Sequence, residues 1–127
     1  MKLNTVFLAA AILGAVFGLF TLLAPGPFMT LEGIAPAFGL GIILRTVGAA
    51  YLGYAALNWM ARGWTDRPAR RGAAFANLVG FGLSAVVTLF GITSGVGAPG
   101  PAWVNFALQL LIALAFAYFI FLKPAEI

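Results

Sequence analysis

The stretch from Leu3 to Ala24 reads LNTVFLAAAILGAVFGLFTLLA and contains no charged residue. It ends at Pro25-Gly26-Pro27, a sequence that terminates helices. A helix needs about 20 apolar residues to cross the hydrocarbon core of a bilayer, so this run is long enough to span it. The run is longer than the ~7–15 apolar residues of a secretory signal peptide and lacks a clear A-x-A cleavage site. We therefore interpret it as a retained first membrane span.

Three further apolar runs follow, at about residues 37–61, 73–92 and 102–122. They are continuous rather than alternating and rich in Ala and Leu, which favours helices over strands. Of the 127 residues, 63% are hydrophobic and 8% are charged, whereas a soluble domain is about 45–50% apolar and about 25% charged. The excess apolar surface must face lipid. The sequence predicts an all-α membrane protein with one domain, residues 1–127, and four transmembrane helices at about 3–24, 37–61, 73–92 and 102–122.

The basic residues predict the orientation of these helices. Because positive residues collect on the cytoplasmic side, the connection between the second and third runs is expected inside, together with Lys2 and Lys123. Short connections favour an antiparallel four-helix bundle, here in a bacterial inner membrane with both termini cytoplasmic. The net charge of +4 is then explained by topology, without nucleic-acid binding. Four of the seven basic residues form the cytoplasmic loop: Arg62, Arg67, Arg70 and Arg71.

Small residues spaced four apart predict close helix packing, either within the chain or against a second copy. Aromatic residues at the ends of the runs predict anchoring at the membrane–water interfaces. The packing residues are Ala10, Gly14 and Gly18 on the first helix and Ala76 and Gly80 on the third, and the anchors are Trp59, Trp64 and Trp103.

One basic residue, Arg45, falls inside an apolar run, about eight residues into the second helix. An arginine in hydrocarbon costs at least ~2.5 kcal/mol and needs a polar partner. Two interpretations stay open. In one, the side chain reaches outward to water or pairs with an acid in the first connection; in the other, it holds a lipid phosphate, a carboxylate or a quinone oxygen. The expected partners at similar depth are Ser84, Thr88, Asn105 and Gln109, with Glu32 as the acid.

A second polar level is expected nearer the cytoplasm. Asn58 and Asn77 lie at similar depths on the second and third helices, and Tyr54 is one turn from Asn58. Hydrogen bonding between helices is the interpretation that we favour for the two amides.

The residue types exclude much chemistry. The chain has no Cys and no His, which removes disulfides, thiolate nucleophiles, imidazole–metal sites and His acid–base catalysis. Its three acids, Glu32, Asp66 and Glu126, lie outside the apolar runs. No phosphate-binding, dinucleotide-binding, zinc-protease or serine-hydrolase motif is present. We expect no metal site, no intrinsic cofactor and no enzymatic activity.

The segments LRTVGAAYLGY (44–54) and LNWMAR (57–62), continued by Arg70-Arg71 and ANLVG (76–80), carry a resemblance. The chain resembles small four-helix bacterial membrane proteins of the DoxX-like kind and related families of unknown function. DoxX is associated with a membrane complex that passes electrons from thiosulfate to quinone. The resemblance implies a four-helix bundle acting as a quinone-side or anchoring subunit. Any electron carrier would be a bound quinone or belong to a partner.

These features are compatible with three functions. The leading one is a non-catalytic integral membrane subunit or scaffold that packs against other subunits or a second copy. The first alternative is a binder of a quinone, lipid or small anionic ligand in an outer-half pocket around Arg45. The second is a small dimeric transporter, although four-helix cation exporters commonly use a membrane-embedded acid, which is lacking here.

Overall fold

The structure is a computed structural model that describes residues 2–127, and its regular elements there are all helical. Four helices are long and apolar enough to cross a membrane, by length and composition: Leu3–Leu23, Leu40–Ala61, Arg67–Thr93 and Pro99–Leu122. This confirms the all-α class and the four long apolar helices. In chain order the elements are α1 (Leu3–Leu23), α2 (Pro25–Glu32), α3 (Leu40–Ala61), α4 (Arg67–Thr93), α5 (Pro99–Ala117), the π-helical turn η1 (Tyr118–Leu122) and the 3₁₀ turn η2 (Pro124–Glu126).

The helix boundaries differ from the prediction because several prolines begin helices. Proline suits the first turn of a helix, where its missing N–H has no partner to lose. Pro25 therefore starts α2 inside the predicted first loop, and Pro99 starts α5 inside the predicted outer turn. Likewise α4 begins at Arg67, where the Asp66 carboxylate caps the helix by accepting a hydrogen bond from Ala69 N at 2.8 Å.

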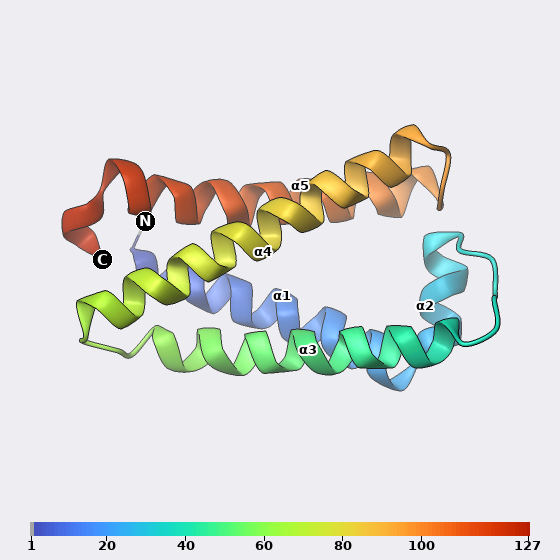
Figure 1. Cartoon of the computed structure of the whole chain (residues 1–127), viewed down its shortest axis with the longest axis horizontal. Helices are drawn as coiled ribbons and strands as arrows, with labels where there is room; N and C mark the ends of the chain where they lie inside the picture. Colours follow the sequence, from blue (N-terminus) through green and yellow to red (C-terminus); the bar gives the residue numbers. More distant parts are fainter. Residues whose placement is uncertain (1) are drawn as a thin grey trace.

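The long helices form two pairs, α1 with α3 and α4 with α5 (Figure 1). The pairs are close together at the end where both termini lie, and they diverge toward the end that carries α2 (Figure 1). Contacts between the pairs are sparse compared with those inside each pair. The fold is thus a bundle that is open on one side.

Glycines allow the close approach of α1 and α3. A β-carbon added at Gly48 would lie 2.6 Å from Thr21 Oγ1, 2.7 Å from Leu22 N and 2.8 Å from Gly18 O. One added at Gly18 would lie 2.9 Å from Gly48 O. Since real β-carbons do not approach other heavy atoms so closely, only glycine fits where these two helices cross. Such small-residue contacts let helices pack tightly without a hydrophobic driving force in lipid.

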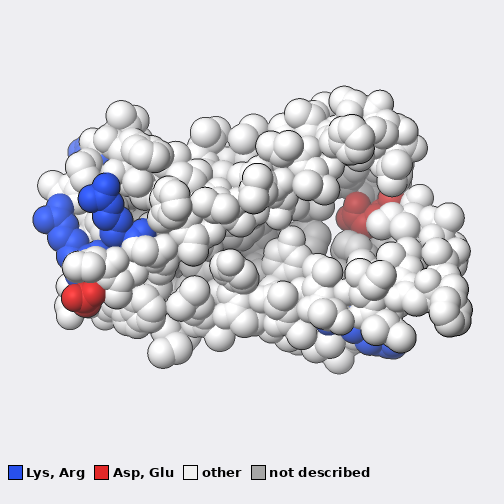
Figure 2. Space-filling model, viewed as in Figure 1, with Lys and Arg blue, Asp and Glu red and all other residues white. Residues whose placement is uncertain are grey.

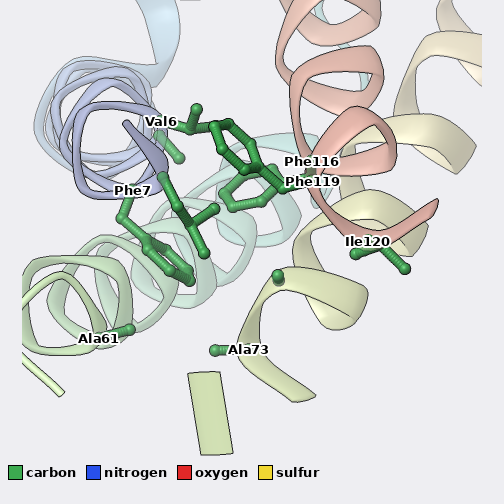
Figure 3. Packing of buried hydrophobic residues seen from close by; sticks show 10 residues of the cluster. Val6, Phe7, Ala61, Ala73, Phe116, Phe119 and Ile120 are labelled. Atoms are coloured by element: carbon green, nitrogen blue, oxygen red, sulfur yellow. The ribbon is translucent and has the colours of Figure 1, made fainter. Parts of the chain in front are cut away.

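A buried aromatic cluster joins the two pairs at the terminal end (Figure 3). Phe7 of α1 and Phe116 of α5 are both fully buried, with ring centroids 5.2 Å apart at 62°. Edge-to-face contacts of this kind add to the stabilisation from burial itself. The cluster comprises Leu3, Val6, Phe7, Ala10, Ala61, Ala73, Ala74, Phe116, Phe119 and Ile120.

Basic side chains gather at this same end, and a separate basic group lies over α3 (Figure 2). Arg70 Nη2 donates to Asn4 Oδ1 at 2.7 Å, and Arg67 Nη2 donates to the Pro124 carbonyl at 2.6 Å. The start of α4 is thereby connected to both ends of the chain. The Arg62 guanidinium lies over the Trp59 ring, 3.4 Å from its centre.

The two connections at the opposite end touch through their backbones. Ala98 N donates to the Glu32 carbonyl at 2.6 Å. Gly33 ends α2 with a φ of 65°, and a β-carbon there would lie 2.7 Å from Ala98 N. We name the contact of residues 32–33 with residues 97–98 the outer clasp. It links the α1–α3 pair to the α4–α5 pair across the wide end of the bundle.

Candidate functional site

The divergence of the two helix pairs leaves a cleft bordered by α3 and α4 (Figure 2). It consists of two hollows with volumes of about 200 Å³ and 350 Å³. Both are lined by Val47, Tyr51 and Ser84, so they adjoin along the middle of the bundle. We call the smaller, which reaches toward the termini, the inner hollow, and the larger the outer hollow.

The cleft walls carry no charged side chain. They are mainly apolar, as expected for a small-molecule site in which a few polar groups fix the orientation of a ligand. The inner hollow is lined by Ala10, Gly14, Val47, Ala50, Tyr51, Tyr54, Asn58, Asn77, Gly80, Phe81 and Ser84. The outer hollow is lined by Phe17, Thr21, Phe28, Leu44, Val47, Tyr51, Leu83, Ser84, Val87, Thr88, Asn105 and Gln109.

A reciprocal amide pair lies at the inner end of the cleft. Asn58 Nδ2 donates to Asn77 Oδ1 at 2.9 Å, and Asn77 Nδ2 donates back to Asn58 Oδ1 at 2.7 Å. Asn77 Nδ2 also donates to the Ala73 carbonyl at 2.8 Å. Both side chains are buried, so their hydrogen bonds avoid the cost of unpaired polar atoms. The predicted hydrogen bonding between these helices is confirmed.

A chain of three polar side chains connects α4 to α5 in the wall of the outer hollow. The Thr88 hydroxyl donates to Gln109 Oε1 at 3.0 Å, and Gln109 Nε2 donates to Asn105 Oδ1 at 2.9 Å. Ser84 lies one turn before Thr88 in the wall of the same hollow. The structure therefore brings together four of the residues that the sequence placed at one depth.

Arg45 does not join them, which corrects the expected pocket. Leu44, Val47 and Tyr51 line the cleft at helical spacings of three and four. Arg45 follows Leu44 by about 100° around the helix, so it lies off this face and its side chain is exposed. α3 begins at Leu40 rather than residue 37, which places Arg45 only roughly 7.5 Å from the helix end. From there a long arginine can reach the headgroup level.

Sequence reasoning missed Tyr51, which lines both hollows. Leu44, Val47 and Tyr51 share one helical face at spacings typical of a stripe, and this spacing was the one indication that the sequence offered. The sequence did not indicate which stripe of an almost wholly apolar helix faces the protein.

The predicted packing residues and interface anchors lie in different environments. Gly14 and Gly18 contact α3, and Ala10 belongs to the aromatic cluster. Gly80 has open space around it and belongs to the cleft wall instead of a close helix contact, and Ala76 is half-buried. Trp64 packs against the aromatic cluster, and the remaining anchors, Trp59 and Trp103, are exposed.

Glu32 lies outside the long helices and forms no ion pair within residues 2–127, where the one salt bridge joins Lys123 to Glu126. The pairing of Glu32 with Arg45, one of the two interpretations left open by the sequence, is therefore not present. Partial burial at the outer clasp raises the pKa of the Glu32 carboxyl above its ordinary value of 4.5. The folded state thus favours the protonated acid, and ionisation at higher pH weakens the fold.

The raised pKa of Glu32 predicts how Glu32→Gln changes the stability of the fold. The stabilisation from protonation is fully present below the ordinary pKa and is lost as the pH rises through the raised value. The neutral glutamine is expected to raise the unfolding midpoint at neutral pH and to leave it unchanged below pH 4.5. Thermal unfolding in detergent across this range checks it. A variant less stable than the parent at neutral pH would show that the ionised carboxylate stabilises the clasp.

No family model, curated protein or solved structure matches the chain. The polar side-chain groups of the site are amides and hydroxyls, which donate and accept hydrogen bonds without carrying charge. Within residues 2–127, no three His, Cys, Asp or Glu side chains lie close enough to hold a metal ion. The arrangement is suited to recognising a ligand.

Proposed function

We propose that this chain is a non-catalytic, multi-pass membrane protein that holds a membrane-soluble ligand in the cleft between its two helix pairs. The cleft itself carries this proposal, because it is an uncharged, mainly apolar space with a few polar groups on its walls. By contrast, α1 and α3 cross so closely at Gly18 and Gly48 that only glycine fits there. A concave, mainly apolar space with a few polar groups is suited to a small ligand.

The position of the cleft favours a ligand from the hydrocarbon. α3 and α4 border it, and large apolar side chains such as Val47, Leu83 and Val87 on these helices are exposed. In a bilayer these faces meet acyl chains, so a lipid-like molecule can enter sideways without crossing water. At the terminal end, the aromatic cluster and the Asn58–Asn77 pair close the bundle. A cleft that ends there favours holding a ligand over passing it through.

We further propose an antiparallel bundle with both termini on the cytoplasmic side of a bacterial inner membrane. The contacts of Gly18 with Gly48 and of Gly14 with Ala55 support opposite directions for α1 and α3, since one number rises as the other falls. Basic residues gather at the terminal end, which supports the cytoplasmic placement of that end. The Thr88–Gln109–Asn105 chain then lies in the outer half of the membrane.

A second candidate is a subunit or scaffold of a larger membrane complex. The observation in its favour is the poor coverage of two helices: in an 18-residue apolar stretch of α3 and of α4, 11% of the residues are buried, against 39% in that of α1. Helices of a partner or a second copy would cover these faces. The resemblance to DoxX-like proteins supports the same role, as a quinone-side or anchoring subunit.

Mass spectrometry of gently extracted protein tests the proposal by comparing the parent with a variant whose cleft is filled by a larger side chain. Gly80 lines the inner hollow, and a β-carbon added there meets no atom within 4 Å, so Gly80→Leu is expected to fill part of the hollow. Gly82 also has open space but is outside the cleft, so Gly82→Leu is the matched control. We expect a small molecule to accompany the parent and the control and to be lost from Gly80→Leu. Equal retention by all three proteins would contradict the cleft as the site, and a stoichiometric protein partner would favour the second candidate.

A further inference from the structure

Resting on the proposed function, a more specific inference concerns the head of the ligand. We propose that the outer hollow recognises a neutral amphiphile through an oxygen that accepts hydrogen bonds, of the carbonyl type found in esters and quinones. The donors are the amide N–H of Asn105 and the hydroxyl of Tyr51.

The direction of the polar chain leaves a donor at its end. Thr88 donates to Gln109 Oε1, and Gln109 Nε2 donates to Asn105 Oδ1. The oxygen of Asn105 is therefore occupied as an acceptor, while its Nδ2 makes no hydrogen bond with residues 2–127. An amide nitrogen donates and does not accept. Asn105 Nδ2, at the end of this hydrogen-bonded series, can therefore donate to an acceptor on a ligand.

This donor and two hydroxyls keep access to open space. Within residues 2–127, the sole buried side-chain polar atom without a partner is Arg70 Nε, at the other end of the molecule. The side-chain polar atoms of Asn105, Tyr51 and Ser84 are not among the buried unpaired atoms, so those that lack a partner are accessible to a ligand. All three residues are half-buried and line the outer hollow. The outer hollow therefore has accessible hydrogen-bond donors on α3, α4 and α5.

The absence of charge in the walls selects against anions. Arg45, the basic residue nearest in sequence to the wall residues, lies off the cleft face. A phosphate or carboxylate entering the hollow would lose its hydration without gaining a cation, which is costly in an apolar surrounding. A neutral carbonyl oxygen loses far less hydration free energy, and hydrogen bonds from Asn105 and Tyr51 compensate for that loss.

The rest of the cleft accommodates an apolar tail. From Thr88 to Asn77 the cleft follows eleven residues of α4, roughly 16 Å along the axis. The wall between them is mostly apolar and includes Ala50, Gly80 and Phe81. A tail directed from the outer to the inner hollow would end near the Asn58–Asn77 pair, whose amides bond to each other.

Binding measurements with three probes of similar tail length test this inference on the purified, delipidated full chain. The probes are a monoacylglycerol, an alkyl benzoquinone and a fatty acid at a pH where it is ionised. We expect at least one neutral probe to bind about tenfold or more tightly than the fatty acid, which corresponds to about 1.4 kcal/mol. The two neutral probes distinguish an ester from a quinone as the source of the carbonyl.

Two variants assign the recognition to the named donors. Asn105→Asp keeps the acceptor for Gln109 and replaces the donor with a carboxylate oxygen, so the neutral probe should bind about tenfold more weakly. Tyr51→Phe keeps the ring and should weaken binding severalfold. Circular dichroism confirms that both variants are folded before binding is compared.

The remaining outcomes separate this inference from the proposed function. If the fatty acid binds as tightly as the neutral probes, or if Asn105→Asp binds like the parent, the neutral-carbonyl inference is overturned. The cleft proposal still stands in that case, provided that Gly80→Leu abolishes binding. If no probe binds and Gly80→Leu retains the same co-extracted molecules as the parent, both are overturned.

Discussion

Replacing Gly48 with valine is expected to destabilise the fold by about 3 kcal/mol, at the upper end of the usual cost of overpacking. A β-carbon there would lie within 2.8 Å of three atoms, two of which, Leu22 N and Gly18 O, belong to the backbone of α1. Backbone atoms of a helix cannot rotate away as a side chain can. The whole of α1 must therefore move away from α3. Unfolding in mixed detergent micelles, followed by tryptophan fluorescence, measures the loss.

The control for this change lies on the same helix. Gly53 has no atom within 4 Å of its added β-carbon, so Gly53→Val makes the same chemical change without a clash. It should alter stability by well under 1 kcal/mol, since valine has a better helix propensity than glycine. Thr21→Ala should not rescue Gly48→Val, because the two backbone contacts persist. Equal effects of Gly48→Val and Gly53→Val would show that the tight crossing is not needed for stability.

The sequence predicted the fold class because hydrocarbon thickness dictates helix length. A run of about 20 apolar residues has few alternatives to a helix, so the four spans were found from composition and continuity alone. Their ends were less predictable. Proline both terminates one helix and starts the next, and Pro25 does both within two residues of Leu23.

The sequence predicted the level along each helix at which the site residues lie, but not the side of the helix toward which they point. Counting residues along each helix placed Thr88, Gln109 and Asn105 at one level, and the structure connects them by hydrogen bonds. Rotation about the helix axis was not accessible, because a lipid-facing stripe and a buried stripe are both apolar in a membrane protein. The exposed position of Arg45 and the position of Tyr51 on the cleft face both follow from that rotation.

Removing one member of the Asn58–Asn77 pair is the second change with a large expected effect. Asn77→Leu leaves the Asn58 amide buried with its oxygen and nitrogen unpaired, which is expected to cost about 1–3 kcal/mol. Leucine is close to asparagine in length, so packing is largely kept. Asn58→Leu should cost a similar amount or slightly less, because Asn77 retains its bond to the Ala73 carbonyl.

The double substitution separates hydrogen bonding from packing. With both residues changed to leucine no buried amide is left unpaired, and replacing both partners with apolar groups is often close to neutral. The double variant should therefore be more stable than the sum of the single losses predicts, by about 1–2 kcal/mol. Double-mutant cycles on single hydrogen bonds between membrane helices give coupling energies that average about 0.6 kcal/mol. The two reciprocal hydrogen bonds of this pair should exceed that average. Strict additivity in the same micelle titration would contradict the pairing. A positive coupling would identify the pair as the polar contact that holds α3 against α4 at the closed end of the cleft.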